Sequence, residues 1–462
     1  MISPASPASR KAPKRFPILF LLALALGAGA GASAQTLAHS HWAGDGISAD
    51  PWWRTAVFYQ IDPLTFQDSN GDGFGDLAGV TQRLDYLQSL NVDAILLSPL
   101  KITLTAGAAP EPDPLYGAPG DFDDLIQQAS RRRIRTIIDL PLTAGRSAAE
   151  MTGLARFWFS RGIAGLRLIR DAKAPMTAAD VEQTARQLRQ VADGFGGQRV
   201  ILADAELGAA SAQLALTPPL ALTDHLSGSD LRRALLDSLA PNRTAPVFFT
   251  DSPDHPRSPD RYADPAQSTA IARLLATLLL TSRSAANLYY GQEIGLQAAS
   301  TTKPESLPAA AQASLAAVAP ALMPWGGTPG FSTGKPWLPI NNTTATVAAE
   351  DPDPKSLLGW YRQLSAMHHN NPALSSGAST LLDTGNPDVV GWIRRPASGD
   401  PVVIVLNLAS HPSQASLTHD LHAGFLRNLI PSTASGSYIQ PIQVGSFTLP
   451  PYGVYIGEPH LK

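Results

Sequence analysis

The chain contains no cysteine among its 462 residues, and this absence excludes several classes of protein. Disulfide frameworks, zinc sites built on thiolates and cysteine nucleophiles all require that residue. Charged residues are also sparse, at 16%, and the net charge is −3. Nucleic-acid-binding proteins carry clustered Lys and Arg because these side chains neutralise phosphate groups. The composition therefore argues against a nucleic-acid partner.

Glycine and proline are not abundant enough to indicate a low-complexity or collagen-like chain, at 37 and 40 residues. Hydrophobic residues make up 44% of the sequence, which is close to the usual share in globular proteins. The length allows up to about three domains of ~150 residues each. We therefore expect a folded protein with a large apolar core.

The N-terminal segment has the pattern of an export signal. Basic residues at positions 10, 11, 14 and 15 precede an almost unbroken apolar run over residues 16–30, and Ala-Ser-Ala follows at 32–34. A basic start, an apolar centre and a small-residue cleavage site define a secretory signal. We expect residues 1–34 to be removed and the protein to be periplasmic or secreted. An uncleaved membrane anchor is the competing interpretation, because the run approaches the ~20 residues that span a bilayer.

Beyond a linker at residues 35–50, short apolar runs typical of buried strands alternate with amphipathic helix patterns. Eight β–α units over residues 51–372 predict a (β/α)8 TIM barrel, which carries its chemistry at the carboxyl ends of the strands. A doubly wound open sheet is the alternative. The expected strands are residues 56–62, 93–99, 134–140, 165–170, 199–205, 220–223, 246–250 and 287–291. The expected helices are residues 77–90, 122–133, 149–161, 178–192, 230–239, 266–281 and 354–369.

The pattern changes after the last of these helices. Short strands without intervening helices are expected at residues 389–394, 402–407, 445–449 and 454–456. Closely spaced short strands are typical of antiparallel sheets. We therefore predict a small antiparallel β domain over residues 373–462.

Several stretches resemble a known family. Residues 53–76 read WRTAVFYQIDPLTFQDSNGDGFGD, and residues 289–295 read YYGQEIG. Residues 323–340 read MPWGGTPGFSTGKPWLPI, and LPPY stands at 449–452. Together they resemble the α-amylase superfamily of glycoside hydrolases (family 13), in particular its oligo-1,6-glucosidase and α-glucosidase branch. The resemblance implies a TIM barrel that acts on the α-glucosidic bonds of an α-glucan or oligosaccharide.

The loop DSNGDGFGD at residues 68–76 is a candidate structural calcium site. Oxygen donors at alternate residues form the kind of cage that Ca²⁺ prefers. The donors would be the side chains of Asp68, Asn70, Asp72 and Asp76 and the carbonyl of Phe74. An EF-hand would have Glu at loop position 12, where this chain has Gly79. The resemblance also implies calcium in this loop, whereas a solvated acidic turn is the competing interpretation.

The nucleophile position departs from the family's pattern. A retaining glycosidase needs a nucleophilic carboxylate and an acid/base carboxylate about 5–5.5 Å apart. The resemblance places the nucleophile two residues after Arg167, where the chain has Ile169, and a hydrocarbon side chain cannot attack a sugar. Asp171 is a candidate substitute on the same strand face, about 7 Å further along the strand. A salt bridge between Asp171 and a neighbouring arginine at the rim is the competing interpretation.

Other catalytic positions are partly kept. At the end of the fifth strand the resemblance implies an acid/base glutamate, and the chain has Asp204 there, with Glu206 two residues later. Either could protonate a leaving group if burial raised its pKa, although two solvated carboxylates would give the same pattern. Residues 252–257, SPDHPR, resemble the family's N-H-D-x-x-R, so that Asp254 is the expected transition-state stabiliser. His255, in the same segment, is interpreted as an exposed loop residue.

By the same resemblance, four residues are expected to contact the sugar: Tyr59, Asp139, Arg167 and Arg257. Asp139 begins the family's D-x-x-x-N-H, but Thr143 and Ala144 replace its Asn and His. Residues 140–164 suffice only for a loop and one helix. The family's inserted B subdomain is therefore expected to be largely absent, which leaves the cleft open.

Two functions remain open after these comparisons of motifs. One is an exported member of the α-glucosidase branch whose hydrolytic activity is weak or lost, since loss of a nucleophile alone can cost several orders of magnitude in rate. The other is a non-catalytic barrel, a pseudoenzyme that binds carbohydrate or a protein. Such a protein would resemble the heavy subunits of heteromeric amino-acid transporters. A membrane partner is expected only if the N-terminal segment is uncleaved.

Overall fold

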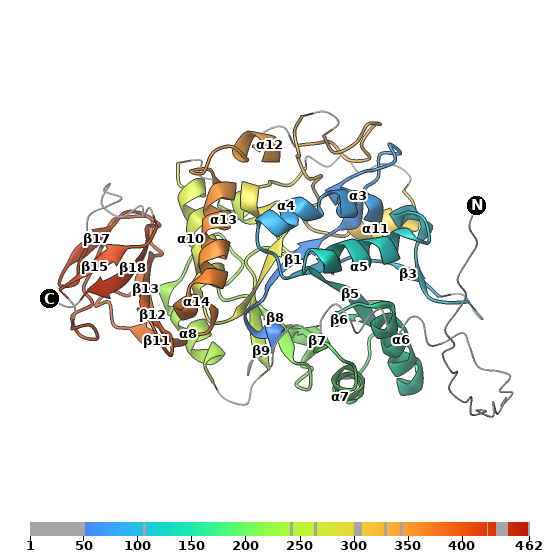
Figure 1. Cartoon of the computed structure of the whole chain (residues 1–462), viewed down its shortest axis with the longest axis horizontal. Coiled ribbons are helices and arrows are strands. Elements are labelled where there is room, and N and C mark those ends of the chain that lie inside the picture. The colour runs from blue at the N-terminus through green and yellow to red at the C-terminus, as the bar shows by residue number, and fades with distance from the viewer. Residues whose placement is uncertain are drawn as a thin grey trace, which may run out of the picture.

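The computed structural model describes residues 51–104, 108–240, 244–262, 266–299, 307–327, 330–341, 345–422, 424–430 and 442–460. The expected signal and linker lie outside these ranges. An α/β body forms the centre of the molecule, and a β domain lies beside it, drawn in red at the C-terminal end (Figure 1).

Eight strands form a closed barrel in the order β1-β10-β9-β8-β7-β6-β5-β2, and neighbouring strands are parallel. They are β1 (Val57–Ile61), β2 (Ala94–Leu97), β5 (Arg135–Leu142), β6 (Gly165–Arg170), β7 (Val200–Asp204), β8 (Leu214–Thr217), β9 (Ala245–Phe248) and β10 (Ala285–Tyr289). The prediction of a TIM barrel is confirmed, and the open-sheet alternative is wrong. The connection from β5 to β6 contains a single helix, as the short sequence between these strands predicts.

The helices cover the outside of the barrel. They are α2 (Pro63–Phe66), α3 (Leu77–Gln82), α4 (Leu84–Ser89), α5 (Asp121–Arg131), α6 (Ala148–Arg161), α7 (Ala178–Asp193), α8 (Gly228–Ser238), α9 (Ser258–Arg261), α10 (Ser268–Thr281), α11 (Ala309–Leu315), α12 (Val347–Glu350), α13 (Leu357–Asn370) and α14 (Pro372–Ser375). Short 3-10 helices are η1 (Trp52–Thr55), η2 (Pro114–Tyr116), η3 (Ala205–Leu207) and η4 (Gln292–Ile294). The expected helix at residues 77–90 is two helices, α3 and α4, which meet at Arg83. Among the described residues, no helix is both long enough and apolar enough to cross a membrane.

The sixth barrel strand was predicted in the wrong place. It was expected at residues 220–223, but the strand in the structure is β8, Leu214–Thr217. Pro218 and Pro219 follow β8, and proline has no N–H to donate to a strand ladder, so the strand ends before them. The connection from β7 to β8 contains η3 and no α-helix, so this part of the barrel wall lacks the usual outer helix.

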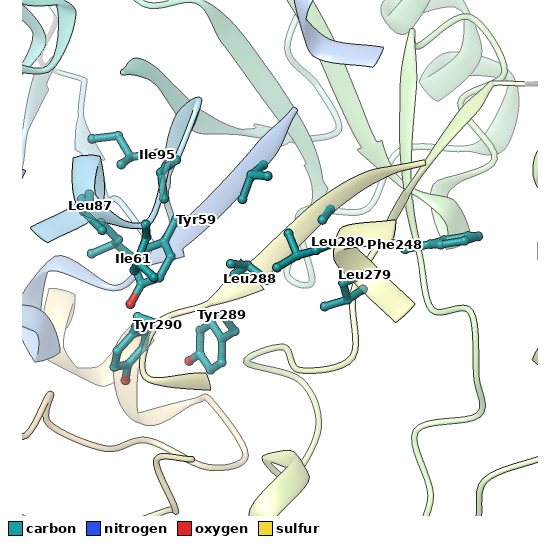
Figure 2. Close-up of a cluster of buried hydrophobic side chains, with 14 of the residues drawn as sticks. Tyr59, Ile61, Leu87, Ile95, Phe248, Leu279, Leu280, Leu288, Tyr289 and Tyr290 are labelled. Atoms are coloured by element: carbon teal, nitrogen blue, oxygen red, sulfur yellow. The ribbon is translucent and has the colours of Figure 1, made fainter. Parts of the chain in front are cut away.

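The barrel strands bury both faces. Phe58, with Ala94 and Leu96 of β2, belongs to the cluster inside the barrel. Tyr59 and Ile61 alternate with Phe58 and belong to the larger cluster between strands and helices (Figure 2). Side chains of a strand point alternately to its two faces, so this parity decides which residues of β1 can reach the interior and its mouth.

The C-terminal domain is an antiparallel β structure, as predicted. A six-stranded sheet has the order β11-β12-β13-β18-β15-β16, and β14 pairs with β17 in a second sheet. The strands are β11 (Ala378–Leu382), β12 (Val389–Arg395), β13 (Val402–Asn407), β14 (Ser413–Ala415), β15 (Phe425–Asn428), β16 (Ile442–Gln443), β17 (Phe447–Leu449) and β18 (Val454–His460). A further two-stranded hairpin, β3 (Ile102–Thr103) with β4 (Glu111–Pro112), follows β2.

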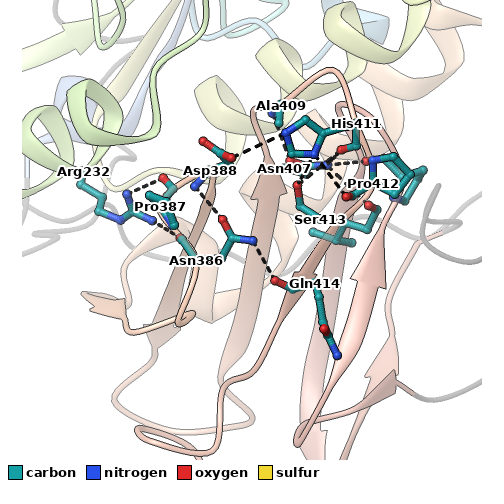
Figure 3. Close-up of polar contacts among 12 residues, drawn as sticks. Arg232, Asn386, Pro387, Asp388, Asn407, Ala409, His411, Pro412, Ser413 and Gln414 are labelled. Atoms are coloured by element: carbon teal, nitrogen blue, oxygen red, sulfur yellow. Dashed lines mark hydrogen bonds and ion pairs between the residues drawn. The ribbon is translucent and has the colours of Figure 1, made fainter.

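Two arginines bind the β domain to the barrel through backbone carbonyls. Arg232 of α8 donates to the carbonyls of Asn386 and Pro387, both at 2.7 Å (Figure 3). Arg394 of β12 is completely buried and donates to the carbonyl of Ser282, just after α10, at 2.7 Å. Because an arginine has five N–H donors in a fixed plane, each can hold several carbonyls of the facing segment in one geometry.

Candidate functional site

A cavity of about 230 Å³ lies at the mouth of the barrel, where the carboxyl ends of its strands meet. Its polar lining consists of Gln60, Arg167, Asp204, Glu206, Ser252, Asp254, His255 and Asn287. Leu216, Leu222 and Phe249 supply apolar surface. The structure thus brings together three of the predicted carboxylates and Arg167, one of the two predicted arginines, although they come from separate parts of the sequence.

A larger hollow of about 720 Å³ lies on the outer wall of the barrel, between the β8–β9 region and α8. Its lining includes Asp230, Arg233 and several alanines and prolines. Arg233 is paired with Asp230 at 2.7 Å. The mouth is the better candidate for chemistry because it holds unlike polar groups aimed at one small volume.

Arg167 of β6 is the centre of the mouth. Its Nε and Nη2 both lie 2.9 Å from Oδ1 of Asp204, and its Nη1 lies 3.5 Å from Oδ1 of Asp139. Nη1 also donates to the hydroxyl of Ser98 at 2.9 Å. The parallel register of β5 and β6 places Asp139 directly opposite Arg167. One buried cation therefore balances carboxylates from the two neighbouring strands.

The carboxyl group of Asp139 has a raised pKa. Burial raises its pKa to about 6, and the charges of Asp204 and Asp254 act in the same direction. Arg167 and the Ser98 hydroxyl partly offset this rise. The side chain of Asp139 is 4% exposed and is not part of the cavity lining. Asp139 is therefore placed to position Arg167 rather than to touch a ligand.

Asp204 and Glu206 both line the cavity, as does Asp254. Asp204 ends β7, and Glu206 is in η3 immediately after it. The Asp204 side chain is 33% exposed and accepts from Arg167, whereas Glu206 and Asp254 are exposed. This arrangement places three acceptors around the space that a polar ligand would occupy.

Ile169 is the last but one residue of β6 and lies opposite Pro141 of β5. Asp171, beyond it, is turned into the rim. Its Oδ2 accepts from the Thr143 hydroxyl at 2.8 Å, and its Oδ1 accepts from the amide of Lys173 at 2.9 Å. These hydrogen bonds hold the pKa of Asp171 below its usual value. In the described part of the chain no arginine is paired with Asp171, which argues against the rim salt bridge. Asp171 also lies outside the cavity lining, and its role as a substitute nucleophile stays a prediction.

Two further predicted sugar contacts, like Asp139, lie outside the cavity lining. Tyr59 is completely buried on the helix side of β1, where its hydroxyl donates to Oε1 of Glu293 at 2.7 Å. Arg257 is also buried: it donates to the carbonyl of Tyr290 at 2.7 Å and lies 4.6 Å from the centre of that ring. Motif resemblance gave both residues a role, but strand parity places Tyr59 on the outer face and turns Gln60 towards the mouth.

The motifs also failed to indicate Gln60, Asn287 and the contact between Ser252 and His255. Ser252 Oγ lies 3.1 Å from Nδ1 of His255 at the cavity wall. The sequence does contain a signal for Gln60 and Asn287. Each is a polar residue at an inward-pointing position of a strand, β1 or β10, that otherwise buries apolar side chains. His255 lines the mouth and is only partly exposed, in contrast to the expected exposed loop histidine.

The candidate calcium loop is folded around its own amides. Oδ1 of Asp68 accepts from the amides of Asn70 and Gly71, at 3.0 and 2.7 Å. Oδ1 of Asp76 accepts from the amide of Gly79 at 2.6 Å and caps α3. Burial raises the pKa of Asp76, and the charge of Asp68 adds to this rise.

The donor set of this loop consists of carboxylate, amide and carbonyl oxygens, which fits the chemistry of Ca²⁺. No group of three or more His, Cys, Asp or Glu side chains that could hold a metal ion occurs among the residues that the structure describes. Calcium binding therefore stays a prediction.

A closed eight-stranded parallel barrel with an acidic mouth and a C-terminal β domain defines the class of TIM-barrel proteins with a strand-end site. Residues 60–143 and 221–377, about half of the chain, match the family model of the α-amylase catalytic domain. The chain belongs to this family, glycoside hydrolase family 13.

Individual relatives support this assignment. A probable α-glucosidase of Rhizobium meliloti is 25% identical, over 88% of this chain and 97% of its own length. The amino acid transporter heavy chain SLC3A2 of Mus musculus is 26% identical, over 79% of this chain and 69% of its own. The crystal structure of the trehalulose synthase MutB from Pseudomonas mesoacidophila MX-45 superposes with a TM-score of 0.69 and 22% identity, covering 88% of this chain and 99% of that one. This last likeness concerns the fold.

Proposed function

We propose that this protein binds an α-glucoside or a related oligosaccharide at the mouth of its barrel and hydrolyses it weakly or not at all. The chain is an α-amylase-family protein related to α-glucosidases. The observation that carries the proposal is the replacement at the nucleophile position. Ile169 stands two residues after Arg167 on β6, and Arg167 is the residue of β6 that lines the cavity, so β6 presents no carboxylate there.

The acid position supports the same proposal. A general acid must present a proton to the leaving oxygen, which requires a carboxyl group with a raised pKa and a free approach to the ligand. Asp204 accepts from Arg167 at 2.9 Å, and Asp139, whose pKa is raised to about 6, is buried behind the cavity lining. Asp139 is therefore out of reach of a ligand, and Asp204, which lines the cavity, is engaged by Arg167.

Export and calcium binding are parts of the same proposal. The basic and apolar N-terminal pattern supports export, and the alternate oxygen donors of residues 68–76 support a structural Ca²⁺. A calcium ion there would be held by the loop after β1, away from the residues that line the mouth.

A protein-binding barrel is the second candidate. The specific observation in its favour is the similarity to a transporter heavy chain over 79% of this chain. A connection from β5 to β6 that contains only α6 is consistent with either candidate. The two differ in whether the mouth has affinity for a sugar.

The test uses the mature chain, residues 35–462. Hydrolysis of p-nitrophenyl α-glucoside, maltose and isomaltose would be measured together with calorimetric binding of the same sugars. We expect binding without efficient turnover, weakened in Asp254→Asn and Glu206→Gln. Asp171→Asn is the matched control, because Asp171 lies outside the cavity lining and should leave binding unchanged.

Turnover well above background that is lost in Asp204→Ala and Asp254→Ala would overturn the proposal of weak activity. Absence of sugar binding, combined with capture of a specific membrane-protein partner, would favour the second candidate.

A further inference from the structure

A further cavity, of about 420 Å³, lies at the opposite end of the barrel from the mouth, and we call it the foot cavity. Its lining includes Trp53 of η1, Asp193 at the end of α7, and Arg199 and Gln213, which immediately precede β7 and β8. The connection from β7 to β8 contains no α-helix, so no helix of that connection covers this side of the foot. Residues at this end of a TIM barrel normally serve stability.

Arg199 is a cation without a counter-ion. It is 6% exposed, and in the described part of the chain its guanidinium has no hydrogen bond or ion pair. Burial lowers the pKa of Arg199 to about 10, and the charge of Arg135 acts in the same direction, so the side chain is still protonated at pH 7. A buried charge without a partner destabilises a fold, and native proteins rarely retain one unless something binds it.

The terminal nitrogens of Arg199 can reach the foot cavity. Its Nε is enclosed, whereas Nη1 and Nη2 are not, and Arg199 is part of the lining. Gln213 adds a second donor: its Oε1 accepts from the amide of Ile201 at 2.9 Å, which fixes the carboxamide, and its Nε2 has no partner among the described residues. Arg199 and Gln213 are each 6% exposed, so two buried side chains present unused N–H groups to one cavity.

The charges of the lining favour an anion. Arg189 adds a second positive charge, and its Nε lies 3.7 Å from Oδ2 of Asp193. The Asp193 side chain is 58% exposed, so solvent and salt screen its charge, whereas Arg199 is buried. The unpaired positive charge therefore lies at the protected part of the cavity, where it acts most strongly on a ligand.

We propose that the foot cavity binds the phosphate group of a small phosphomonoester. The fork of an arginine and the N–H of a carboxamide match a phosphate, which has more charge and more acceptor oxygens than a carboxylate. The cavity volume lies within the ~300–1,000 Å³ of small-molecule sites, and Trp53 and Phe195 supply apolar surface for an organic substituent. This site is independent of the proposed sugar site, because foot and mouth are at opposite ends of the strands.

The experiment measures calorimetric binding and melting temperature of residues 35–462 with phenyl phosphate, inorganic phosphate and benzoate at constant ionic strength. We expect phenyl phosphate to bind most tightly and to raise the melting temperature. Arg199→Met should increase its Kd by roughly tenfold or more, because the variant loses charge-assisted hydrogen bonds. Without phosphate, Arg199→Met should melt at the same temperature as wild type or higher, because an unpaired buried charge is removed.

Gln213→Glu tests the site with the arginine in place, and it serves if Arg199→Met does not fold. It keeps the acceptor for the amide of Ile201 and adds a negative charge to the lining, so it should abolish the binding of phenyl phosphate. Arg186→Gln is the matched control: Arg186 is also on α7, its side chain is 62% exposed and it lies outside the lining, so binding should not change. Sugar binding at the mouth should be the same in all three variants.

No heat with phenyl phosphate and an unchanged melting temperature would overturn the phosphate site, while the proposed function would stand. Wild-type affinity in Arg199→Met, combined with a lower melting temperature, would also overturn it, because Arg199 would then stabilise the foot without a ligand. Equal affinity for benzoate, or equal weakening in Arg186→Gln, would overturn it in favour of general attraction of anions. Inorganic phosphate that binds as tightly as phenyl phosphate would overturn the assignment of an organic substituent.

Discussion

The guanidinium of Arg167 donates to Oδ1 of Asp204 at 2.9 Å. The carboxylate at the family's acid/base position is therefore hydrogen-bonded to an arginine of the neighbouring strand. On its other side the same guanidinium lies 3.5 Å from Asp139. The arginine thus stabilises two acidic side chains of unequal exposure, 33% for Asp204 and 4% for Asp139. This difference leads to the first prediction.

Arg167→Met should destabilise the protein far more than Asp204→Asn. The first change leaves Asp139 buried without a cation, which costs about 3–5 kcal/mol in the free energy of unfolding. The second removes a partly solvated partner and should cost no more than about 1 kcal/mol. Urea unfolding at pH 7 measures both, and equal costs would show that Arg167 is not needed to balance Asp139.

Ile169→Asp should bring measurable hydrolysis to the mouth. The new carboxylate would stand two residues after Arg167 on the same face of β6, where the family has its nucleophile. We expect turnover of p-nitrophenyl α-glucoside at least about tenfold above wild type, and more in Ile169→Asp/Asp204→Glu, because a covalent route needs both carboxylates.

Ile169→Asn is the matched control for this change, since it is nearly isosteric with the aspartate and has no charge. No gain in either aspartate variant would mean that the loss of activity extends beyond the nucleophile, to the residues that replace the family's Asn-His pairs.

Sequence patterns were sufficient for the barrel and for part of its mouth. The strands at residues 165–170 and 402–407 match β6 and β13 residue for residue. Residues 402–407, VVIVLN, are a nearly continuous apolar run with clear ends. The sixth strand was misplaced, because its four residues carry a weak signal and apolar residues continue beyond Pro218 and Pro219.

The candidate site was predictable where chain order and parity determine position. Asp204 and Asp254 share the cavity, since all strand ends of a parallel barrel meet at one face. Motif resemblance alone misplaced Tyr59. The contact between Gln60 and Asn287 depends on the closure of β1 against β10, a pairing of segments 227 residues apart that no local pattern contains.

Asp62→Asn should make stability less dependent on pH. Burial raises the pKa of Asp62 to about 7, so the folded state binds its proton more tightly than the unfolded state does. The stability from this group is fully present below about pH 4 and is lost as the pH rises towards 7. Asn caps a helix as well as Asp does, so the hydrogen bond from the amide of Leu64 at 3.1 Å should remain.

We therefore expect the urea midpoint of Asp62→Asn to equal that of wild type at pH 4 and to exceed it at pH 8. The corresponding gain in the free energy of unfolding is on the order of 1.4 kcal/mol per unit of pKa shift. A lower unfolding midpoint at pH 8 would show that the ionised carboxylate stabilises the fold, which would contradict this assignment.

Calcium should stabilise the folded protein through the loop at residues 68–76. An ion that binds only the folded state adds about 2.7 kcal/mol at a concentration one hundred times its Kd, so the melting temperature of EDTA-treated protein should rise by a few degrees. Asp72 is the informative position, because its exposed Oδ1 accepts from the amide of Phe74 at 2.8 Å. Asp72→Asn keeps that acceptor and removes one negative charge, so we expect unchanged stability without calcium and a smaller rise with it.

Asp124→Asn is the matched control, since Asp124 is an exposed acidic residue of α5 outside the loop and should leave the calcium response intact. Mg²⁺ should stabilise less than Ca²⁺, because Mg²⁺ demands a near-octahedral shell and a flexible oxygen loop satisfies the larger ion better. Titration calorimetry that detects no heat, together with an unchanged melting temperature, would instead identify residues 68–76 as an acidic turn held by its own amide hydrogen bonds.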